Sequence, residues 1–322
     1  MDLTVTRLAR RGAVLVLALA LSGCSIKTMA VNTLGNALSE GTSGFAKDDD
    51  PELVRDAIPF ALKTIETLID SSPKHKGLLT AACSGFTSYG YAFIQQEADY
   101  IEAQDLDRAT AMRIRAKKMY LRALDYGLRA FEVDDPGFRE RLRRDPNAAL
   151  VKTTKKQVPL LYWTAAAWGA AFSIDKADSS LSVNQNVIEA LMRRAIALDE
   201  SWDLGSLHDF FITWEGGRTS VGGSLDKAKE HFERAKALAH GQRVSPFVTW
   251  AEDISVGAQN KKEFAALLTE ALAIDVAKAA PEQRLANLLA QKRARWLLSR
   301  VDELFVEQPR PEGFALWPLL MD

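Results

Sequence analysis

The sequence predicts an all-α protein, and three observations support the prediction. Apolar residues recur at three- and four-residue spacing through most of the chain, which is the period of a helix with one buried face. Sustained alternation of apolar and polar residues with β-branched enrichment, typical of strands, is absent from the sequence. Glycine and proline make up only 30 of the 322 residues, so long helices meet few interruptions.

Composition excludes several classes of protein. The 41 basic and 42 acidic residues give a formal net charge of −1, without the basic surplus that a nucleic-acid-binding protein needs. Cys24 and Cys83 are the only cysteines, which rules out a disulfide framework and a four-thiolate zinc site. Because Cys83 stands among Leu78, Leu79 and alanines, we expect a buried, unreactive thiol there.

Residues 1–23 are an expected targeting segment and are set apart from the fold. Three arginines precede the apolar run 13–21, which is too short to cross a membrane as a helix. The letters LSGC at positions 21–24 then resemble the lipobox of bacterial lipoproteins, in which the cysteine is lipidated and becomes the first mature residue. The sequence therefore predicts cleavage before Cys24 and a lipid anchor on it.

The predicted location is the periplasmic side of a bacterial membrane. Ser25 favours the outer membrane, because an aspartate at that position tends to mark retention at the inner membrane. Loss of residues 1–23 removes three arginines and one aspartate, which leaves 38 basic and 41 acidic residues in the mature chain. Residues 24–49 are small and polar, and we interpret them as a tether with one or two helical turns.

The folded domain is predicted to begin at Asp50-Pro51-Glu52, a helix start with an N-cap acceptor followed by proline at the first helical position. Pro59 should kink this helix or confine its regular part, and Ser71-Ser72-Pro73 should end it. Further helix starts are predicted at Asp145-Pro146 and Ser245-Pro246, and at Asn260 with Glu263, which resembles a capping box.

One type of helix recurs along the chain: a small residue, a large residue four positions later, and a small residue three after that. The stripes are Ala116/Tyr120/Ala123 and Ala228/Phe232/Ala235, with degenerate copies at Ile188/Met192/Ala195, Phe264/Leu268/Ala271 and Ala61/Ile65/Leu68. Equivalent alanines at 195, 235 and 271 lie near the 34-residue period of tetratricopeptide (TPR) repeats.

The predicted fold is therefore a TPR-like array of helical hairpins over residues 50–306, an α-solenoid or superhelix. Residues 132–156 form an insertion, and residues 285–304 form a C-terminal capping helix. The tail 307–322 is predicted to lie outside the array. Small-large-small spacing also describes a plain helical bundle, which stays the alternative.

No catalytic or metal-binding motif is visible in the sequence. The four histidines are scattered, and the adjacent pair His208-Asp209 does not share a helix face. We therefore predict no catalytic residue, no metal and no cofactor, and a protein that is not an enzyme.

Aromatic residues are the candidates for a ligand cleft. Most fall on the expected first helices of hairpins, which line the concave face of a TPR array, and an apolar ligand would pack against them. The candidates are Tyr89, Tyr91, Tyr162, Trp163, Trp168, Trp214 and Trp250. Packing within the hairpins is the alternative role for each of them.

Four arginines form a second candidate surface. They are spaced seven residues apart and so lie in one column along a helix, at Arg108, Arg115, Arg122 and Arg129. Such a column would suit a channel or an acidic partner. A solvated flank that covers the hydrophobic seam is the alternative.

Several segments, taken in order, resemble the TRAP transporter T-component (TatT-like) lipoproteins. They are DPELVRDAIPFALKTIETLI (50–69), GFTSYGYAFIQQEAD (85–99), RAKKMYLRALDYGLRAF (115–131), LYWTAAAWGAAFS (161–173), GGSLDKAKEHFERAKAL (222–238) and NLLAQKRARWLLSRVDELF (287–305). The resemblance implies a periplasmic, lipid-anchored helical protein that binds the substrate-binding P component of a tripartite ATP-independent periplasmic transporter. It also implies a small hydrophobic organic ligand in a cleft or pore, and a homotrimer.

The expected function is thus a non-enzymatic accessory to ligand uptake. The alternative is a structural TPR lipoprotein that serves as a scaffold for an outer-membrane or envelope complex.

Overall fold

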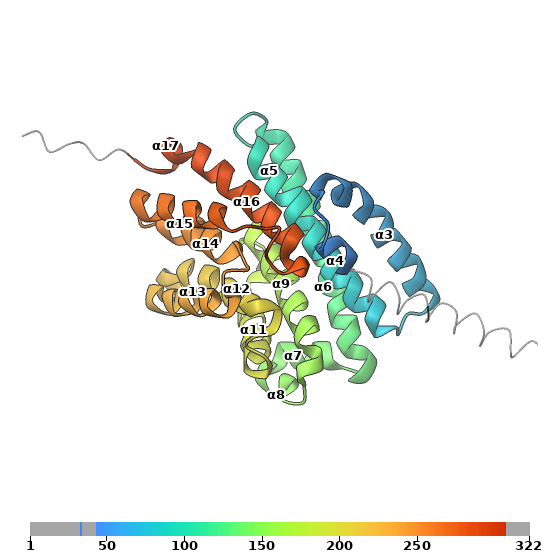
Figure 1. The fold of residues 1–322 in the computed structure, drawn as a ribbon. Helices are drawn as coiled ribbons and strands as arrows, with labels where there is room; N and C mark the ends of the chain where they lie inside the picture. Colours follow the sequence, from blue (N-terminus) through green and yellow to red (C-terminus); the bar gives the residue numbers. More distant parts are fainter. Residues whose placement is uncertain (1–32, 34–42, 307–322) are drawn as a thin grey trace, which may run out of the picture.

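The computed structural model describes residue 33 and residues 43–306, which are helical with short connections and contain no strand (Figure 1). The predicted anchor Cys24 and the tail 307–322 lie outside the described residues. The longer helices are α3 (Pro51–Ser71), α4 (Lys76–Gly90), α6 (Leu106–Asp134), α9 (Val158–Ile174), α11 (Gln185–Leu198), α12 (Ser206–Gly216), α13 (Leu225–Ala239), α15 (Lys261–Ala273) and α16 (Arg284–Ser299). All-helical architecture is confirmed, while the solenoid arrangement stays a prediction.

Shorter elements connect these helices. The short α-helices are α2 (Ser43–Ala46), α5 (Gln96–Ile101), α7 (Phe138–Arg144), α8 (Pro146–Leu150), α10 (Ser179–Ser182), α14 (Ser245–Trp250) and α17 (Val301–Leu304). Single 3₁₀ turns are η2 (Lys155–Gln157), η3 (Trp202–Gly205), η4 (Thr219–Val221) and η6 (Pro281–Gln283), and π-helical segments are η1 (Tyr91–Gln95) and η5 (Ala251–Ser255). The predicted insertion 132–156 contains α7 and α8, and the predicted capping helix is divided at Arg300 into α16 and α17.

Most predicted helix starts are confirmed by their caps. The Asp50 carboxylate accepts hydrogen bonds from the backbone N–H groups of Glu52 and Leu53, and α3 then runs through Pro59 to Ser71. Asp145 and Asn260 cap α8 and α15 in the same way. The predicted start at Ser245-Pro246 is confirmed, because α14 begins at Ser245, but the predicted cap is wrong: the Ser245 hydroxyl donates to Asp209 Oδ2 at 2.7 Å and does not cap the helix.

Buried side chains form two hydrophobic cores that meet at α12. The larger core takes residues from α3 through α12, including Leu207, Phe211 and Trp214, and the smaller core takes residues from α12 onwards, beginning with Ile212. The predicted small-large-small stripes face these cores: Ala116, Tyr120 and Ala123 are fully buried, as are most of their equivalents. Alanines at these positions let α6 pack closely on α4 and α9.

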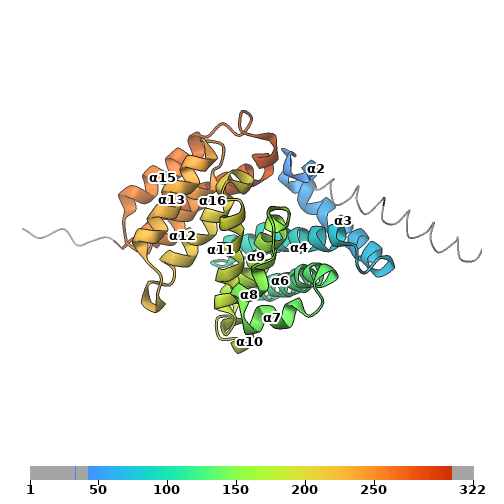
Figure 2. The ribbon, with the colours of Figure 1, turned by 90° about the horizontal axis from the view of Figure 1, so that it is seen from below.

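The last long helix returns to the start of the chain. In Figure 2, one end of α16 lies beside α2, and α16 also contacts α3. Lys47 Nζ lies 3.2 Å from Glu282 Oε1, and the Tyr100 and Trp296 rings meet with centroids 5.2 Å apart. The beginning of the described chain is therefore in contact with η6 and α16. Within the part of the chain that the structure describes, no helix combines the length and apolar character needed to cross a membrane.

Candidate ligand recess and its ion-pair network

Two π-helical segments carry the residues of the candidate site. The segment η1 widens the continuous helix formed by α4 and α5, and η5 follows α14 directly. Their i→i+5 bonds run from Gln96 N–H to the Tyr91 carbonyl and from Val256 N–H to the Ala251 carbonyl. Such turns are rare and are found frequently at functional sites, because they push side chains out of the regular helical register.

Tyr91, the first residue of η1, is 53% exposed. Burial, then the charge of Glu252, raises the pKa of its hydroxyl to about 12, and the charge of Asp253 adds to the shift. Because Glu252 and Asp253 belong to η5, the two π-helical segments lie close to each other. We take the region between them as the candidate recess for a ligand.

Asp253 gives the recess a titratable carboxylate. It is exposed, and its Oδ2 accepts a 2.5 Å hydrogen bond from the Thr213 hydroxyl. Burial raises its pKa to about 6, Thr213 opposes that shift, and the charge of Glu252 adds to it. The carboxylate is therefore mainly ionised at neutral pH and becomes protonated in mildly acidic conditions.

Tyr162 lies near Tyr91, because the charge of Tyr91 acts on its hydroxyl. Its half-buried ring packs between Trp163 and Trp202, with centroids 4.9 and 4.8 Å away. Burial, then the charges of Asp203 and Asp209, raise the pKa of its hydroxyl. The charge of an ionised Tyr91 would raise that pKa further. We use the name η1–η5 recess for this candidate ligand region, which is defined by the neighbouring residues Tyr91, Tyr162 and Asp253.

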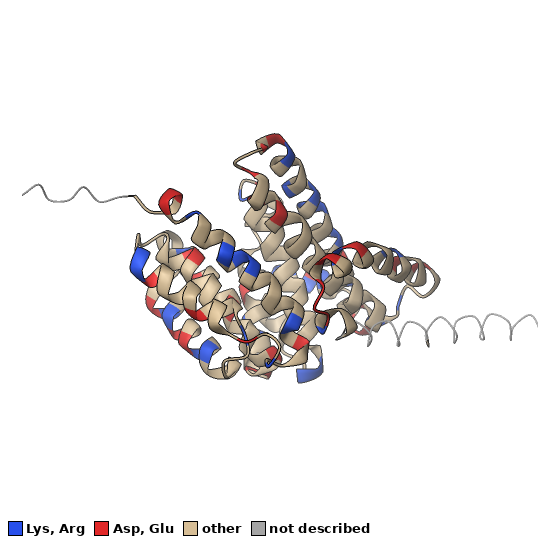
Figure 3. Cartoon of the chain, turned by 45° about the horizontal axis from the view of Figure 1, so that its top comes forward, with Lys and Arg blue, Asp and Glu red and all other residues tan. Residues whose placement is uncertain are grey.

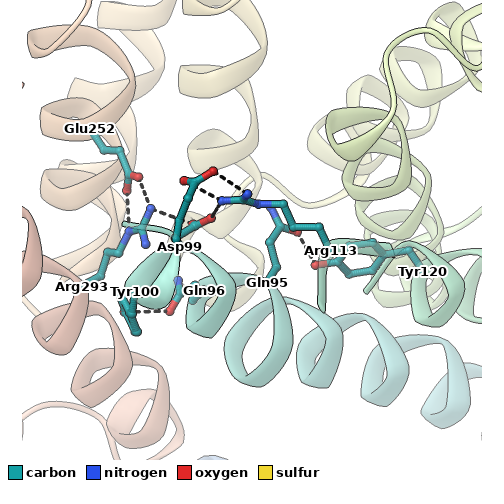
Figure 4. A network of polar contacts seen from close by, with 9 residues as sticks. Gln95, Gln96, Asp99, Tyr100, Arg113, Tyr120, Glu252 and Arg293 are labelled. Carbon is teal, nitrogen blue, oxygen red and sulfur yellow. Dashed lines mark hydrogen bonds and ion pairs between the residues drawn. The ribbon is translucent and has the colours of Figure 1, made fainter. Parts of the chain in front are cut away.

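A chain of ion pairs beside η1 and η5 joins four elements (Figure 4). Arg293 on α16, only 7% exposed, pairs with Glu252 of η5 and with Asp99 of α5, 3.1 Å away. Asp99 also lies 2.8 Å from Arg113 of α6, which bonds Glu102 at 2.7 Å. Burial disfavours the charged form of Arg293, but the hydrogen bond and charge of Glu252 outweigh it and raise the pKa of the guanidinium.

Two tyrosines form hydrogen bonds with the glutamines at the junction of η1 and α5. The buried Tyr120 hydroxyl donates to Gln95 Oε1 at 2.6 Å, and the Tyr100 hydroxyl lies 3.5 Å from Gln96 Oε1 (Figure 4). Because Gln95 and Gln96 lie at the end of η1 and the start of α5, these bonds fix the turn that projects Tyr91.

The structure separates the predicted cleft residues into two groups. Tyr91, Tyr162 and Trp163 are partly exposed and lie at or beside the recess. Tyr89, Trp168, Trp214 and Trp250 are buried in the cores, where Trp214 stacks on Phe210 and Trp250 lies tilted against Phe232. Asp253, Arg293 and Glu252 carried no sequence signal, because Arg293 lies 41 positions from Glu252 and 194 from Asp99.

The four arginines of the predicted column also fall into two groups, two with contacts inside the described chain and two without an ion pair. Arg122 lies 3.4 Å from Glu66 and over the Phe86 ring, and Arg129 lies over the Tyr126 ring. Arg108 and Arg115 are exposed and form no ion pair with any residue that the structure describes.

Cys83 and the histidines make contacts within the fold. Cys83 is fully buried, and burial raises the pKa of its thiol to about 12. No sequence motif links His208 to His231, but their Nδ1 atoms lie 2.8 Å apart. His208 Nε2 lies 3.3 Å from Glu200 Oε1. Within residues 43–306, His, Cys, Asp and Glu side chains form no group of three that could hold a metal ion.

The described helices and the ion pairs between them define an all-α protein. The chain belongs to one family of such proteins, the TRAP transporter T-components, whose family model matches residues 47–305. The chain is also 29% identical over 305 residues to an uncharacterized protein of Treponema pallidum (strain Nichols), which covers 89% of this chain and 94% of that protein. Family membership gives the protein an accessory role in a TRAP transporter and sets it apart from known enzyme families.

Proposed function

We propose that the protein is a non-enzymatic, lipid-anchored periplasmic accessory of a TRAP transporter that binds the substrate-binding P component. A small hydrophobic organic ligand occupies the η1–η5 recess, and the periplasmic protein is held at the membrane, with the outer membrane favoured, through Cys24. The observation that supports the ligand proposal is the position of Tyr91, an exposed aromatic residue on one π-helical segment that lies close to the carboxylates of the other.

The recess supports an apolar ligand with one polar group. The Tyr91 and Tyr162 rings supply apolar surface, while the Thr213–Asp253 pair supplies a hydrogen-bonding position beside them. Arg293 and Arg243 are each committed to carboxylates, to Glu252 and Asp209, so they provide no free cation for the ligand.

Ligand binding is tested with the neutral apolar probe N-phenyl-1-naphthylamine, titrated into the full mature chain by fluorescence. Tyr91→Ala should weaken binding roughly three- to tenfold, because the loss of one aromatic contact costs about 0.5–1.5 kcal/mol. Phe60→Ala is the matched control, since Phe60 is 78% exposed on the outer face of α3. Equal affinity of both variants and the wild type would remove Tyr91 from the ligand site.

The anchor and the partner need separate tests. Labelling cells with a radioactive fatty acid should mark the wild-type protein and leave Cys24→Ser unmarked, and membrane fractionation should find the labelled protein with the outer membrane. Calorimetry should detect binding to the P component of a TRAP transporter from the same organism. Absence of labelling would refute the anchor, and absence of binding would refute the partner.

A scaffold for an envelope protein complex is the second candidate function. It is favoured by the burial of Trp168, Trp214 and Trp250, because these side chains pack in the cores and supply no surface to a small ligand. A scaffold would bind the P component or another protein and leave the apolar probe in solution. A homotrimer, expected from the resemblance to the family, fits either candidate, and sedimentation of the purified protein tests it.

A further inference from the structure

Two histidines join α12 to α13 at the place where the two hydrophobic cores meet. His208 on α12 is 4% exposed, His231 on α13 is half-buried, and their Nδ1 atoms lie 2.8 Å apart. The two helices are antiparallel and closely packed beside the pair, because a Cβ atom at Gly205 would lie 2.7 Å from Leu238 Cβ. The outer side of α13 carries acidic and basic residues (Figure 3), so its inner side, with His231, makes the attachment to α12.

The hydrogen-bonding rules of imidazole limit the number of protons that this pair can hold. A bond between two Nδ1 atoms needs one hydrogen, so one ring donates and the other accepts. His208 Nε2 lies 3.3 Å from Glu200 Oε1, and because a carboxylate accepts, this contact assigns a hydrogen to Nε2 of His208. In the neutral pair His208 Nδ1 therefore accepts from His231 Nδ1–H. One added proton, on His231 Nε2, leaves that bond intact, whereas a second, on His208 Nδ1, puts two hydrogens between the rings and breaks it.

The surroundings of the pair oppose the second proton. Burial lowers the pKa of both rings, and the charge of a protonated His208 lowers the pKa of His231 further. Glu200, the carboxylate beside His208, is shared with Arg234, whose Nε donates to Oε1 at 2.7 Å. The charged groups that act on the rings from α11, α12, α13 and the turn after α11 are Glu200 and Asp209, which favour protonation, and Arg193, Arg234 and Lys227, which oppose it. Burial and three cations together outweigh the two carboxylates.

We propose that the His208–His231 pair is an acid-sensitive switch, which fastens α13 to α12 at neutral pH and releases α13 when both rings are protonated. Two imidazolium rings repel each other and have no acceptor between them. When His231 leaves the pair, its ring also loses the stacking on Phe211, whose centroid lies 4.7 Å away, and α13 keeps the packing of Ala228 and Phe232 in the smaller core. Released histidines titrate near pH 6.5, so the released form binds more protons and gains population as the pH falls below that value. Neither the ligand nor the P component takes part in the switch.

The test is hydrogen exchange of the backbone amides in the full mature chain at pH 7 and pH 5, expressed as protection factors. Protection of α13 should fall about a hundredfold from pH 7 to pH 5, because the released pair binds up to two more protons, and at pH 5 α13 should exchange at least about tenfold faster than α9. In His231→Gln, whose amide still bonds His208 without titrating, the fall should be about tenfold. His240→Asn is the matched control, since it removes an exposed histidine at the end of α13, with a left-handed φ of 49° that asparagine adopts, and the hundredfold fall should remain.

A second measurement examines the pair directly. Nitrogen-15 NMR of the imidazole rings at pH 7.5 should find hydrogen on Nδ1 of His231 and on Nε2 of His208. Hydrogen on Nε2 of both rings would remove the shared bond and overturn the proposal. Unchanged protection of α13 at pH 5, or a hundredfold fall that persists in His231→Gln, overturns it as well. Equal exchange of α13 and α9 at pH 5 does the same, because the pair then opens only with the whole domain. Should His231→Gln fail to fold by circular dichroism, the wild-type spectrum and the comparison of α13 with α9 still decide.

Discussion

The two hydrophobic cores are stabilised by different means. The buried polar side chains beside the larger core are mainly small threonines, Thr87, Thr153 and Thr164. Small residues also bring its helices together: a Cβ atom at Gly127 would lie 2.4 Å from Thr164 Oγ1 and 2.9 Å from Cys83 Sγ. The smaller core is surrounded by buried polar side chains with specific partners, among them Arg243, Asn287, Gln291 and Arg293. Gln291 alone donates to the Ala271 and Ile274 carbonyls.

The difference predicts how each part responds to substitution. Apolar packing loses stability in proportion to the contacts removed, and neighbouring side chains absorb part of the change. A buried polar contact loses the bond and also leaves its partner desolvated without compensation. We therefore expect the smaller core to be more sensitive to single substitutions of its polar residues.

The largest expected effect follows removal of Arg243. Its side chain is 6% exposed and pairs with Asp209, itself 15% exposed, so Arg243→Met should reduce the free energy of unfolding by roughly 3 kcal/mol or more. Arg234→Met is the control, because the Arg234–Glu200 pair is exposed and is worth at most about 1 kcal/mol. Urea unfolding followed by circular dichroism measures both. Equal losses in the two variants would contradict the polar account of the smaller core.

The next effect concerns Asn287, which is 2% exposed and joins α16 to the start of α14. Its Oδ1 accepts from Val244 N–H at 2.9 Å, and its Nδ2 donates to the Gln242 carbonyl at 2.8 Å. Asn287→Ala should cost about 2 kcal/mol, since a buried N–H loses its acceptor. On the same helix, Ser299→Ala removes an exposed bond and should cost less than about 0.5 kcal/mol.

A smaller effect tests the larger core. Gly127→Ala places a methyl group against Thr164 and Cys83 and should cost about 1–2 kcal/mol through overpacking. The same change at Gly169, where the nearest atom is 3.6 Å from the added Cβ, should be neutral or stabilising by up to about 1 kcal/mol. Thermal unfolding of the two variants makes the comparison, and a stable Gly127→Ala variant would show that this contact relaxes easily.

The smallest effect is a pH dependence located where the cores meet. Burial, followed by the charge of His208, lowers the pKa of His231 to about 4, and burial also lowers the pKa of His208. Because an unfolded histidine titrates near 6.5, the unfolded state binds more protons below that pH, and stability falls as the pH drops from about 6.5 towards 4. In His231→Gln the loss between pH 7 and pH 5 should shrink by about 1 kcal/mol. Denaturant unfolding at the two pH values measures it, and an unchanged loss would assign the acid sensitivity to other groups.

Local features of the fold were predictable from the sequence. Asp50, Asp145 and Asn260 predict helix starts because a capping side chain accepts a hydrogen bond from a backbone N–H two or three residues later. The stripe through Tyr120 shows which face of α6 is buried. Ser245 failed as a cap because Asp209, 36 residues earlier, takes its hydroxyl.

The candidate site was predicted only in part, because it depends on contacts between residues that are far apart in the sequence. Tyr91 and Trp168 look alike as aromatic residues on helices, and only the surrounding helices leave one exposed and bury the other. The two π-helical segments and the contact of Arg293 with Glu252 and Asp99 depend on tertiary packing, which no local pattern encodes.

The contact between the first and last helices has a mechanical consequence. Lys47 pairs with Glu282, and Arg284 donates to the Lys47 carbonyl at 3.4 Å, so the chain entering α3 is attached to the start of α16. Tension applied upstream of Ser43 is therefore shared between the beginning and the end of the folded chain. Because the Lys47–Glu282 pair is exposed and contributes little stability, this attachment yields under a small load and α3 then bears the rest.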